Sequence, residues 1–346
     1  MRSAVPLGPA ARDHLVAKKA REEATDGWLQ QAEAHLRRAV EHFGSERDLR
    51  SIKVGDVKAF GAWLRALPNG RGGLLGRGAV RHHVNSLSNL FGALVETEVV
   101  AMNPVAAWKN KPRAERRESR WLEAHEVALL FEAARLAPAG RAVPFLYPLI
   151  AAFALTGGRV SDVLGLEVSD VSFDRRTVTF RPNGWRRLKT RQSARVVPLW
   201  PQLEEILRAY VFEAPPGRLL FPVFRGGIEY MAHDYRRALD AVAVRAGWKA
   251  GEIRSRMMRH SYTASRLQTL DGGEPVSTFT VSRELGHGGT SMVETIYAHL
   301  GTVRVRSAAV EYRVEQHAAK LGERLVALRS GTVCANLARK EAGASA

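Results

Sequence analysis

Residues 257–300 read MMRHSYTASRLQTLDGGEPVSTFTVSRELGHGGTSMVETIYAHL, and this stretch decides how the rest of the chain is interpreted. Arg259 and His260 are adjacent, His287 follows a Leu-Gly pair, and Tyr297 comes ten residues later. A guanidinium grips a phosphate through two parallel hydrogen bonds. An imidazole exchanges protons near neutral pH, and a phenol hydroxyl can act as a nucleophile. The stretch therefore indicates chemistry on a phosphate.

The chain carries a large positive charge. Its 346 residues include 52 lysines and arginines against 35 aspartates and glutamates, which gives a net charge of +17. A surplus of this size favours a polyanionic partner, because each neutralised phosphate releases counterions. A solvated basic surface without a partner is the alternative that the charge alone leaves open. We expect nucleic acid.

Cysteine usage and hydropathy exclude several other classes. A single cysteine, Cys334, allows neither an internal disulfide framework nor a cysteine-based metal cluster. The start of the chain has no apolar core of signal-peptide length. The longest apolar run, 142–155, is interrupted by Pro144 and Pro148 and is too short to span a bilayer. We expect no membrane role and a cytoplasmic, nucleoid-associated location.

Residues 21–108 show the pattern of a small all-helical domain. Apolar residues recur at helical spacing in the segments 25–44 and 54–67, and again after residue 78. Residues 1–20 are expected to form a loosely ordered or partly helical N-terminal arm.

A glycine-rich loop, residues 70–78, joins two of these helices. It does not follow a strand and lacks the terminal Lys-Ser/Thr pair, so it is not a nucleotide-binding P-loop. A flexible connector is the simplest interpretation. Arg71 and Arg77 are candidate contacts to a DNA backbone.

Residues 109–120 form the clearest domain boundary. The segment has six basic residues, one proline and no apolar periodicity, which predicts an extended, solvated linker. Because it joins two parts of a strongly basic protein, Lys109 and Lys111 are candidate contacts to a phosphate backbone.

A second domain, 121–312, is expected to be mainly helical around one β region. The segments that have strand character are 171–173, 177–180, 186–189 and 195–199. A three-stranded antiparallel meander is the simplest arrangement for them. The basic side chains Arg186, Arg187 and Arg191 are interpreted as a patch that binds DNA backbone. Residues 313–346 are expected to form a C-terminal helix and a polar tail.

Four motifs carry a resemblance to a known family. They are RHSYTAS at 259–265, LGH at 285–287 with IYAHL at 296–300, TGGRVSDVLGL at 156–166, and KTRQSARVVPL at 189–199. In this order they resemble the tyrosine recombinases, or phage integrase family, over residues 20–312. The resemblance implies a mainly α fold with a small antiparallel β-sheet. An all-helical core-binding (SAM-like) domain would precede a mixed α/β catalytic domain.

The resemblance also implies roles for the residues in the motifs. Arg159 and Arg259 would hold the non-bridging oxygens of a DNA phosphate, and Tyr297 would attack the phosphorus to form a 3′-phosphotyrosyl intermediate. His260 is the candidate base or proton relay for the tyrosine, and His287 a donor to a phosphate oxygen. Taken singly, each has a structural alternative. Arg159 could cap a helix, His287 could end one, and Tyr297 could belong to the core.

Three further residues complete this set. Lys189 would protonate the departing 5′-oxygen, and Asp162 would support the turn that carries the first arginine. The family usually places a histidine three residues before the second arginine, where this chain has Arg256. Arginine can donate to a phosphate oxygen but cannot give up its proton, so Arg256 is expected to be a phosphate contact only.

The implied activity is site-specific recombination of double-stranded DNA without cofactor, metal or ATP. Four protomers would assemble on DNA from free monomers, with residues 313–346 as a candidate docking element, and accessory DNA-bending or directionality factors are compatible with it. A type IB topoisomerase and a non-catalytic DNA-binding protein remain alternatives. A metal-dependent nuclease is disfavoured, because the carboxylates are scattered in the sequence.

Overall fold

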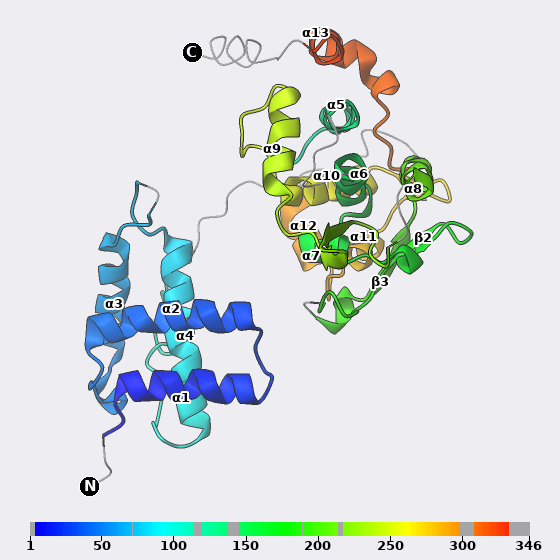
Figure 1. Ribbon diagram of the computed structural model, residues 1–346. Coiled ribbons are helices and arrows are strands. Elements are labelled where there is room, and N and C mark those ends of the chain that lie inside the picture. The colour runs from blue at the N-terminus through cyan, green and yellow to red at the C-terminus, as the bar shows by residue number, and fades with distance from the viewer. Residues whose placement is uncertain are drawn as a thin grey trace, which may run out of the picture. The chain divides into compact units, whose positions relative to one another are not determined.

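The computed structural model divides the chain into two compact units, residues 1–118 and 119–346 (Figure 1). The residues that the structure describes are 4–70, 72–113, 120–137, 145–188, 190–213, 217–297 and 308–331, with the side chain of Arg191 left out. Each unit has its own apolar cluster of buried side chains. We call them the N-terminal unit and the C-terminal unit.

In the described residues of the N-terminal unit, helices joined by loops are the regular elements. Its helices are α1 Leu7–Ala20, α2 Asp26–Phe43, α3 Val54–Ala66 and α4 Arg77–Glu96. Thr25 begins α2, because its side-chain oxygen accepts a hydrogen bond from the backbone N–H of Trp28 (3.3 Å). The apolar stripe of α4 is buried from Val80 to Phe91, and the helix packs against α2 and α3, as its helical spacing predicts.

The first helix belongs to the core of this unit. Leu7 and Ala11 of α1 are buried in the same apolar cluster as Leu36 of α2. The backbone N–H groups of Leu7 and Gly8 donate to the carbonyls of Arg47 and Ser45, which fixes where α1 begins. Of the two expectations for residues 1–20, the structure shows the helical one, and it differs in that the helix packs into the core of the unit instead of forming an arm. Half of the apolar residues in this segment are small alanines, and the burial of the segment depends on partners that lie farther along the chain.

The C-terminal unit is a helical assembly with small antiparallel sheets, which confirms the predicted fold class. Its helices are α5 Ala124–Arg135, α6 Leu146–Thr156, α7 Val160–Leu164, α8 Pro201–Glu213, α9 Arg236–Arg245, α10 Ser255–Leu267, α11 Thr278–Glu284, α12 Ser291–Tyr297 and α13 Ala318–Arg329. From Pro148 to Thr156, α6 is buried on all sides and packs against α10 (Figure 1). No helix among the described residues is long and apolar enough to cross a membrane.

The predicted three-stranded meander is present, in the order β1-β2-β3. It consists of β1 Val171–Ser172, β2 Thr177–Phe180 and β3 Arg195–Pro198. In the predicted strand segment 186–189, the described residues 186–188 belong to no strand, and Arg186 forms an isolated bridge with Asn183, while residue 189 lies outside the described residues. Two hairpins were missed, and they are β4 Pro222–Arg225 with β5 Ile228–Met231, and β6 Leu270–Asp271 with β7 Glu274–Pro275. Both turn at adjacent glycines with positive φ, which is a recognised hairpin signal.

The described part of the C-terminal segment packs on its own unit. Leu321, Leu325 and Leu328 of α13 are buried in the large apolar cluster. Arg329 donates to Glu132 of α5 (2.9 Å), and Arg324 donates to the carbonyl of Ala246 (2.9 Å). This helix is therefore a structural part of the C-terminal unit, whatever else it contacts.

Replacing Leu7 with alanine should destabilise the N-terminal unit by about 2–4 kcal/mol, because a fully buried leucine leaves a cavity. Hydrogen exchange of the α4 amides measures this. Val16→Ala in the same helix is the control, because Val16 is 67% exposed, and it should change stability by less than about 0.5 kcal/mol. Equal effects of the two substitutions would contradict the core position of α1.

Candidate active site

A cavity of about 610 Å³ in the C-terminal unit brings together residues from four segments. These segments are the turn between α6 and α7, helix α10, the turn after α11, and α12. Six of the residues selected from the sequence motifs line it: Arg159, Arg256, Arg259, His260, His287 and Tyr297. Residues separated by more than a hundred positions thus meet at one place.

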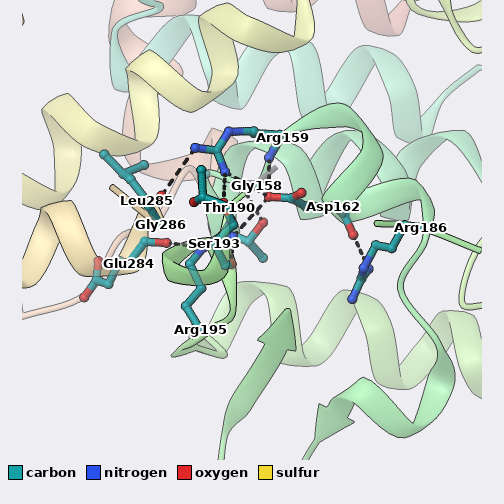
Figure 2. Close-up of polar contacts among 12 residues, drawn as sticks. Gly158, Arg159, Asp162, Arg186, Thr190, Ser193, Arg195, Glu284, Leu285 and Gly286 are labelled. Carbon is teal, nitrogen blue, oxygen red and sulfur yellow. Dashed lines mark hydrogen bonds and ion pairs between the residues drawn. The ribbon is translucent and has the colours of Figure 1, made fainter. Parts of the chain in front are cut away.

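The turn that ends α6 places Arg159 at the cavity. Gly157 has a left-handed backbone (φ +60), and a Cβ there would lie 2.5 Å from Cδ1 of Tyr262. Glycine is therefore required by both conformation and space. Arg159 donates from one guanidinium nitrogen to Oγ of Ser193 (3.2 Å) and from the other to the carbonyl of Gly286 (3.4 Å) (Figure 2). Its side chain remains 28% exposed.

Arg259 is held at the back of the cavity by main-chain carbonyls. It donates to Gly157 (2.6 Å) and Leu285 (2.7 Å), so α10 ties together two of the turns that carry site residues. Burial, together with the positive charges of Arg159 and Arg195, lowers the pKa of Arg259 to about 9. The guanidinium remains charged at neutral pH and lacks a carboxylate partner among its described hydrogen bonds. Such a group favours the approach of an anion.

His287 is neutral at neutral pH in the free protein. Burial and the nearby Arg259, Arg159 and Arg195 lower its pKa to about 4. Its Nε2 lies 3.0 Å from the guanidinium of Arg259, which can only donate, so Nε2 accepts and Nδ1 carries the proton. Nδ1 is buried without a hydrogen-bond partner among the described residues. To donate from Nε2 to a phosphate, His287 must therefore change its tautomer or gain a proton.

Tyr297 and His260 form a direct pair. The phenol Oη lies 2.5 Å from Nδ1 of His260. Burial raises the pKa of Tyr297 to about 12. Burial, followed by the charges of Arg256 and Arg259, lowers the pKa of His260 to about 4. At neutral pH the tyrosine is therefore protonated and the histidine is neutral, so the phenol donates to the imidazole.

Two residues behind the cavity were not predicted as site residues. Ser193 is fully buried, and its hydroxyl accepts from Arg159. Arg195 is buried too and donates to Oδ2 of Asp162 (3.0 Å). The predicted support by Asp162 is consistent with its own contact, since Oδ2 accepts from the backbone N–H of Arg159 (3.4 Å). The alternation of Arg195 with buried Val197 along β3 was the sequence signal that could have placed it inside.

The structure contradicts the prediction that Arg186 contacts DNA. Its side chain is 1% exposed and forms an ion pair with Asp170 (3.3 Å). Its guanidinium also donates to the carbonyls of Asp162 and Arg181. All three guanidinium nitrogens of Arg186 thus donate to oxygens of the protein, and Arg186 is a structural residue. Arg187 next to it is exposed, so its predicted contact with DNA remains a prediction.

Three predicted residues cannot be placed. Lys189, the side chain of Arg191, and Arg71 lie outside the described residues.

The N-terminal unit contains a basic groove. It has a volume of about 620 Å³ and includes Arg77, Lys109 and Lys111, which were predicted to contact DNA. Lys111 also donates to the carbonyl of Val105 (2.7 Å), which anchors it to the unit. The sequence patterns did not single out other basic residues of the groove, which are Lys58, Arg65 and Arg113. Trp108 forms part of the lining.

Side chains that could ligate a metal are not clustered in the described parts of the chain. Among those residues, no group of three or more His, Cys, Asp and Glu is arranged to hold a metal ion.

Comparison with known proteins identifies the family. The chain matches the model of the phage integrase family over residues 120–303, which is more than half of its length, and it belongs to this family. The resemblance seen in the motifs is thereby confirmed.

Sequence identity to individual relatives is low. The chain is 28% identical to the tyrosine recombinase XerD of Brucella suis biovar 1 over 173 residues, which are 48% of this chain and 52% of that protein. The match thus spans about half the length of this relative.

Two of the solved structures that are similar in fold are integrases bound to DNA. The Tn1549 transposon integrase with circular intermediate DNA has a TM-score of 0.66 at 15% identity, over 86% of this chain and 96% of that one. A lambda integrase (75–356) dimer on a core site has a TM-score of 0.61 at 16% identity, over 83% and 97%.

Arg186→Ala should lower the free energy of unfolding by about 1–3 kcal/mol, because it removes one of the two arginine partners of the buried Asp170 and the donor to the carbonyls of Asp162 and Arg181. Chemical denaturation of the full chain measures this. Arg187→Ala is the matched control and should change stability by less than about 0.5 kcal/mol. If Arg186→Ala left stability unchanged and weakened DNA binding as much as Arg187→Ala, a structural role for Arg186 would be contradicted.

Proposed function

We propose that this protein is a site-specific DNA recombinase that cleaves and rejoins strands through a covalent 3′-phosphotyrosyl intermediate. One observation carries the proposal. Arg159, Arg259 and His287 line the same cavity as a tyrosine whose hydroxyl is hydrogen-bonded to a neutral histidine. The site thus combines cations for a phosphate with a nucleophile and an acceptor for its proton.

In the cleavage step, Oη of Tyr297 attacks the phosphorus and the bond from phosphorus to the 5′-oxygen breaks. Arg159 and Arg259 neutralise the charge on the non-bridging oxygens. The loss of one preorganised donor of this kind typically costs on the order of 3–4 kcal/mol of barrier. As the family resemblance implies, Lys189 gives a proton to the departing 5′-oxygen. Attack by a free 5′-hydroxyl reverses these steps and rejoins the strand, so the energy of the broken bond is retained in the phosphotyrosine.

The phenol proton passes to Nδ1 of His260. A tyrosine whose pKa is raised to about 12 needs such an acceptor to react near neutral pH. His260 can serve because its ring is neutral at neutral pH and its Nδ1 lies 2.5 Å from the phenol oxygen. Arg256 lies where the family usually has a histidine and cannot accept a proton. His260 therefore performs the proton transfer, while Arg256 contacts phosphate.

Double-stranded DNA is the proposed substrate, and the basic groove of the N-terminal unit supplies contacts to its backbone. Arg77 and Lys109 are exposed in this groove, and the whole chain has a net charge of +17. Basic side chains at phosphates give affinity and register without reading sequence. We expect the protein to act in the cytoplasm, where it reaches its DNA.

Strand exchange between two duplexes requires several active sites, so we propose that free monomers assemble as a tetramer on DNA. A lambda integrase tetramer bound to a Holliday junction has a TM-score of 0.60 with this chain, which shows a shared fold. The outer face of α13, where Val326 is 68% exposed, is the proposed docking surface. Accessory DNA-bending or directionality factors would act on this assembly.

In a duplex nicked a few nucleotides from the cleavage site, cleavage releases a short fragment that carries the free 5′-hydroxyl. Because the strand can then not be rejoined, the intermediate should be trapped as a covalent protein–DNA adduct. The adduct should be absent with Tyr297→Phe and retained with Tyr230→Phe, because Tyr230 lies on the β4–β5 hairpin outside the cavity. Denaturing gel electrophoresis measures it. An adduct with Tyr297→Phe, or none with the wild type, would contradict the mechanism.

The same assay in excess EDTA should give an unchanged adduct yield, because guanidinium groups are proposed to neutralise the phosphate. An absolute requirement for Mg²⁺ would favour metal-dependent chemistry instead.

A second assay separates a recombinase from a type IB topoisomerase. A recombinase exchanges strands between two DNA sites, whereas a topoisomerase only relaxes a supercoiled plasmid.

Adduct formation at limiting DNA should be independent of pH between about 6 and 8, because the free-protein pKa governs this regime and that of His260 is about 4. The acid limb should move to higher pH in Arg256→Gln, because removing a nearby positive charge raises the pKa of His260. Rapid-quench kinetics over a pH series measures both. An inflection near pH 6.5 in the wild type, or a tenfold faster Arg256→His variant, would contradict the assignment of His260.

A further inference from the structure

Arg195 is a buried arginine that the proposed chemistry does not use. It lies on β3 with 3% of its side chain exposed, and its guanidinium sits 4.1 Å from the centre of the Phe180 ring. Removing a guanidinium from water costs several kcal/mol unless its donors are satisfied. A residue that bears this cost behind a phosphate-binding cavity calls for an explanation.

The contacts of Arg195 join three separate segments. Its Nη1 donates to Oδ2 of Asp162 on α7 (3.0 Å) and to the carbonyl of Ser193 (2.8 Å). Its Nε donates to the carbonyl of Glu284 (2.6 Å), the last residue of α11. Figure 2 shows Arg195 reaching toward this carbonyl beneath Ser193. One guanidinium thus fixes α7, the turn before β3 and the turn that leads to His287.

Arg159 depends on the same three segments. It donates to the hydroxyl of Ser193 and to the carbonyl of Gly286, and it lies 3.7 Å from Oδ2 of Asp162. Gly286 fits closely against this arrangement, since a Cβ there would lie 3.2 Å from Cδ of Arg195. Arg195 is thus hydrogen-bonded to two of the described partners of the Arg159 side chain, Asp162 and Ser193. The third partner, Gly286, lies two residues after Glu284, whose carbonyl accepts from Arg195.

Asp162 determines how the site responds to the loss of Arg195. Its buried carboxylate is nearer to Arg195 (3.0 Å) than to Arg159 (3.7 Å). Arg186 contacts only the main-chain carbonyl of Asp162 in this network. Without Arg195, the buried charge would have Arg159 as its nearest cation and would attract that guanidinium away from the cavity.

We propose that Arg195 is a positioning residue for DNA cleavage: it pairs with Asp162 and fixes Ser193 and Glu284, so that the Arg159 guanidinium stays at the cavity to neutralise the scissile phosphate. This inference rests on the proposed function. It assigns a role in the reaction to a side chain that touches neither the DNA nor the nucleophile.

The test compares two duplexes, one with the natural scissile phosphate and one with a methylphosphonate there. The methylphosphonate lacks the negative charge that Arg159 neutralises. On the phosphate, Arg195→Met should slow adduct formation about 100-fold, with DNA affinity within about twofold of wild type. On the methylphosphonate the loss should shrink to about fivefold or less, and Arg159→Ala should show the same pattern.

Arg266→Met is the matched control. Arg266 is also buried and also bonds to Glu284, through the carboxylate, yet it contacts none of the described partners of Arg159. A general loss of stability should slow this variant by the same factor on both duplexes.

Two further variants separate positioning from folding. Arg195→Lys keeps a charge beside Asp162 and should lose about tenfold or less on the phosphate. Adding Asp162→Asn to Arg195→Met removes the carboxylate that attracts Arg159 and should restore at least about tenfold of the lost rate.

Wild-type rates in Arg195→Met, or equal losses on both duplexes without rescue by Asp162→Asn, would overturn the inference. A wild-type protein that forms no adduct on any duplex would instead overturn the proposed function, and this inference with it.

Discussion

Like charges held together in a half-buried cavity are the constraint on which the C-terminal unit depends. Arg159 and Arg259 line the cavity and Arg195 lies behind it, and burial, followed by the positive charges of Arg159 and Arg195, lowers the pKa of Arg259. Backbone carbonyls and the carboxylate of Asp162 offset this repulsion. Because the carbonyls come from fixed turns, they hold the guanidinium groups without neutralising them. The remaining positive potential is available to an anion, and a phosphate would relieve the repulsion.

The same constraint sets the protonation states of the other groups. Burial and the neighbouring guanidinium groups keep His260 and His287 neutral. A neutral His260 can accept the proton of Tyr297, which a charged imidazole could not do. Burial and the guanidinium charges that attract the phosphate thus also keep the imidazole unprotonated before it receives the phenol proton.

How much of this site could be predicted depended on how local its signals are. Arg259, His287 and Tyr297 were found because each lies in a short motif, and the Gly-Gly pair before Arg159 indicates a turn in a conformation that favours glycine. Arg186 was misassigned because a basic cluster in sequence looks solvated, while its burial depends on Asp170, sixteen positions away. Arg195 was missed for a similar reason, since its partners Asp162 and Glu284 lie 33 and 89 positions away.

The fold shows the same division. Helices with a full apolar stripe, such as α4, were predicted, because periodicity is a local property. The burial of α1 and the hairpin β4–β5 were not, since the first depends on contacts with α2 and the second on a Gly-Gly turn that was passed over. Sequence patterns thus predicted the residues that line the cavity better than the buried residues and elements that hold them in place.

Mass spectrometry of the protease-digested adduct tests the central claim most directly, because it identifies both the linked residue and the linked end of the DNA. The account predicts a nucleotide attached through its 3′-phosphate to the peptide that contains Tyr297. Attachment to any other residue, or through a 5′-phosphate, would contradict it.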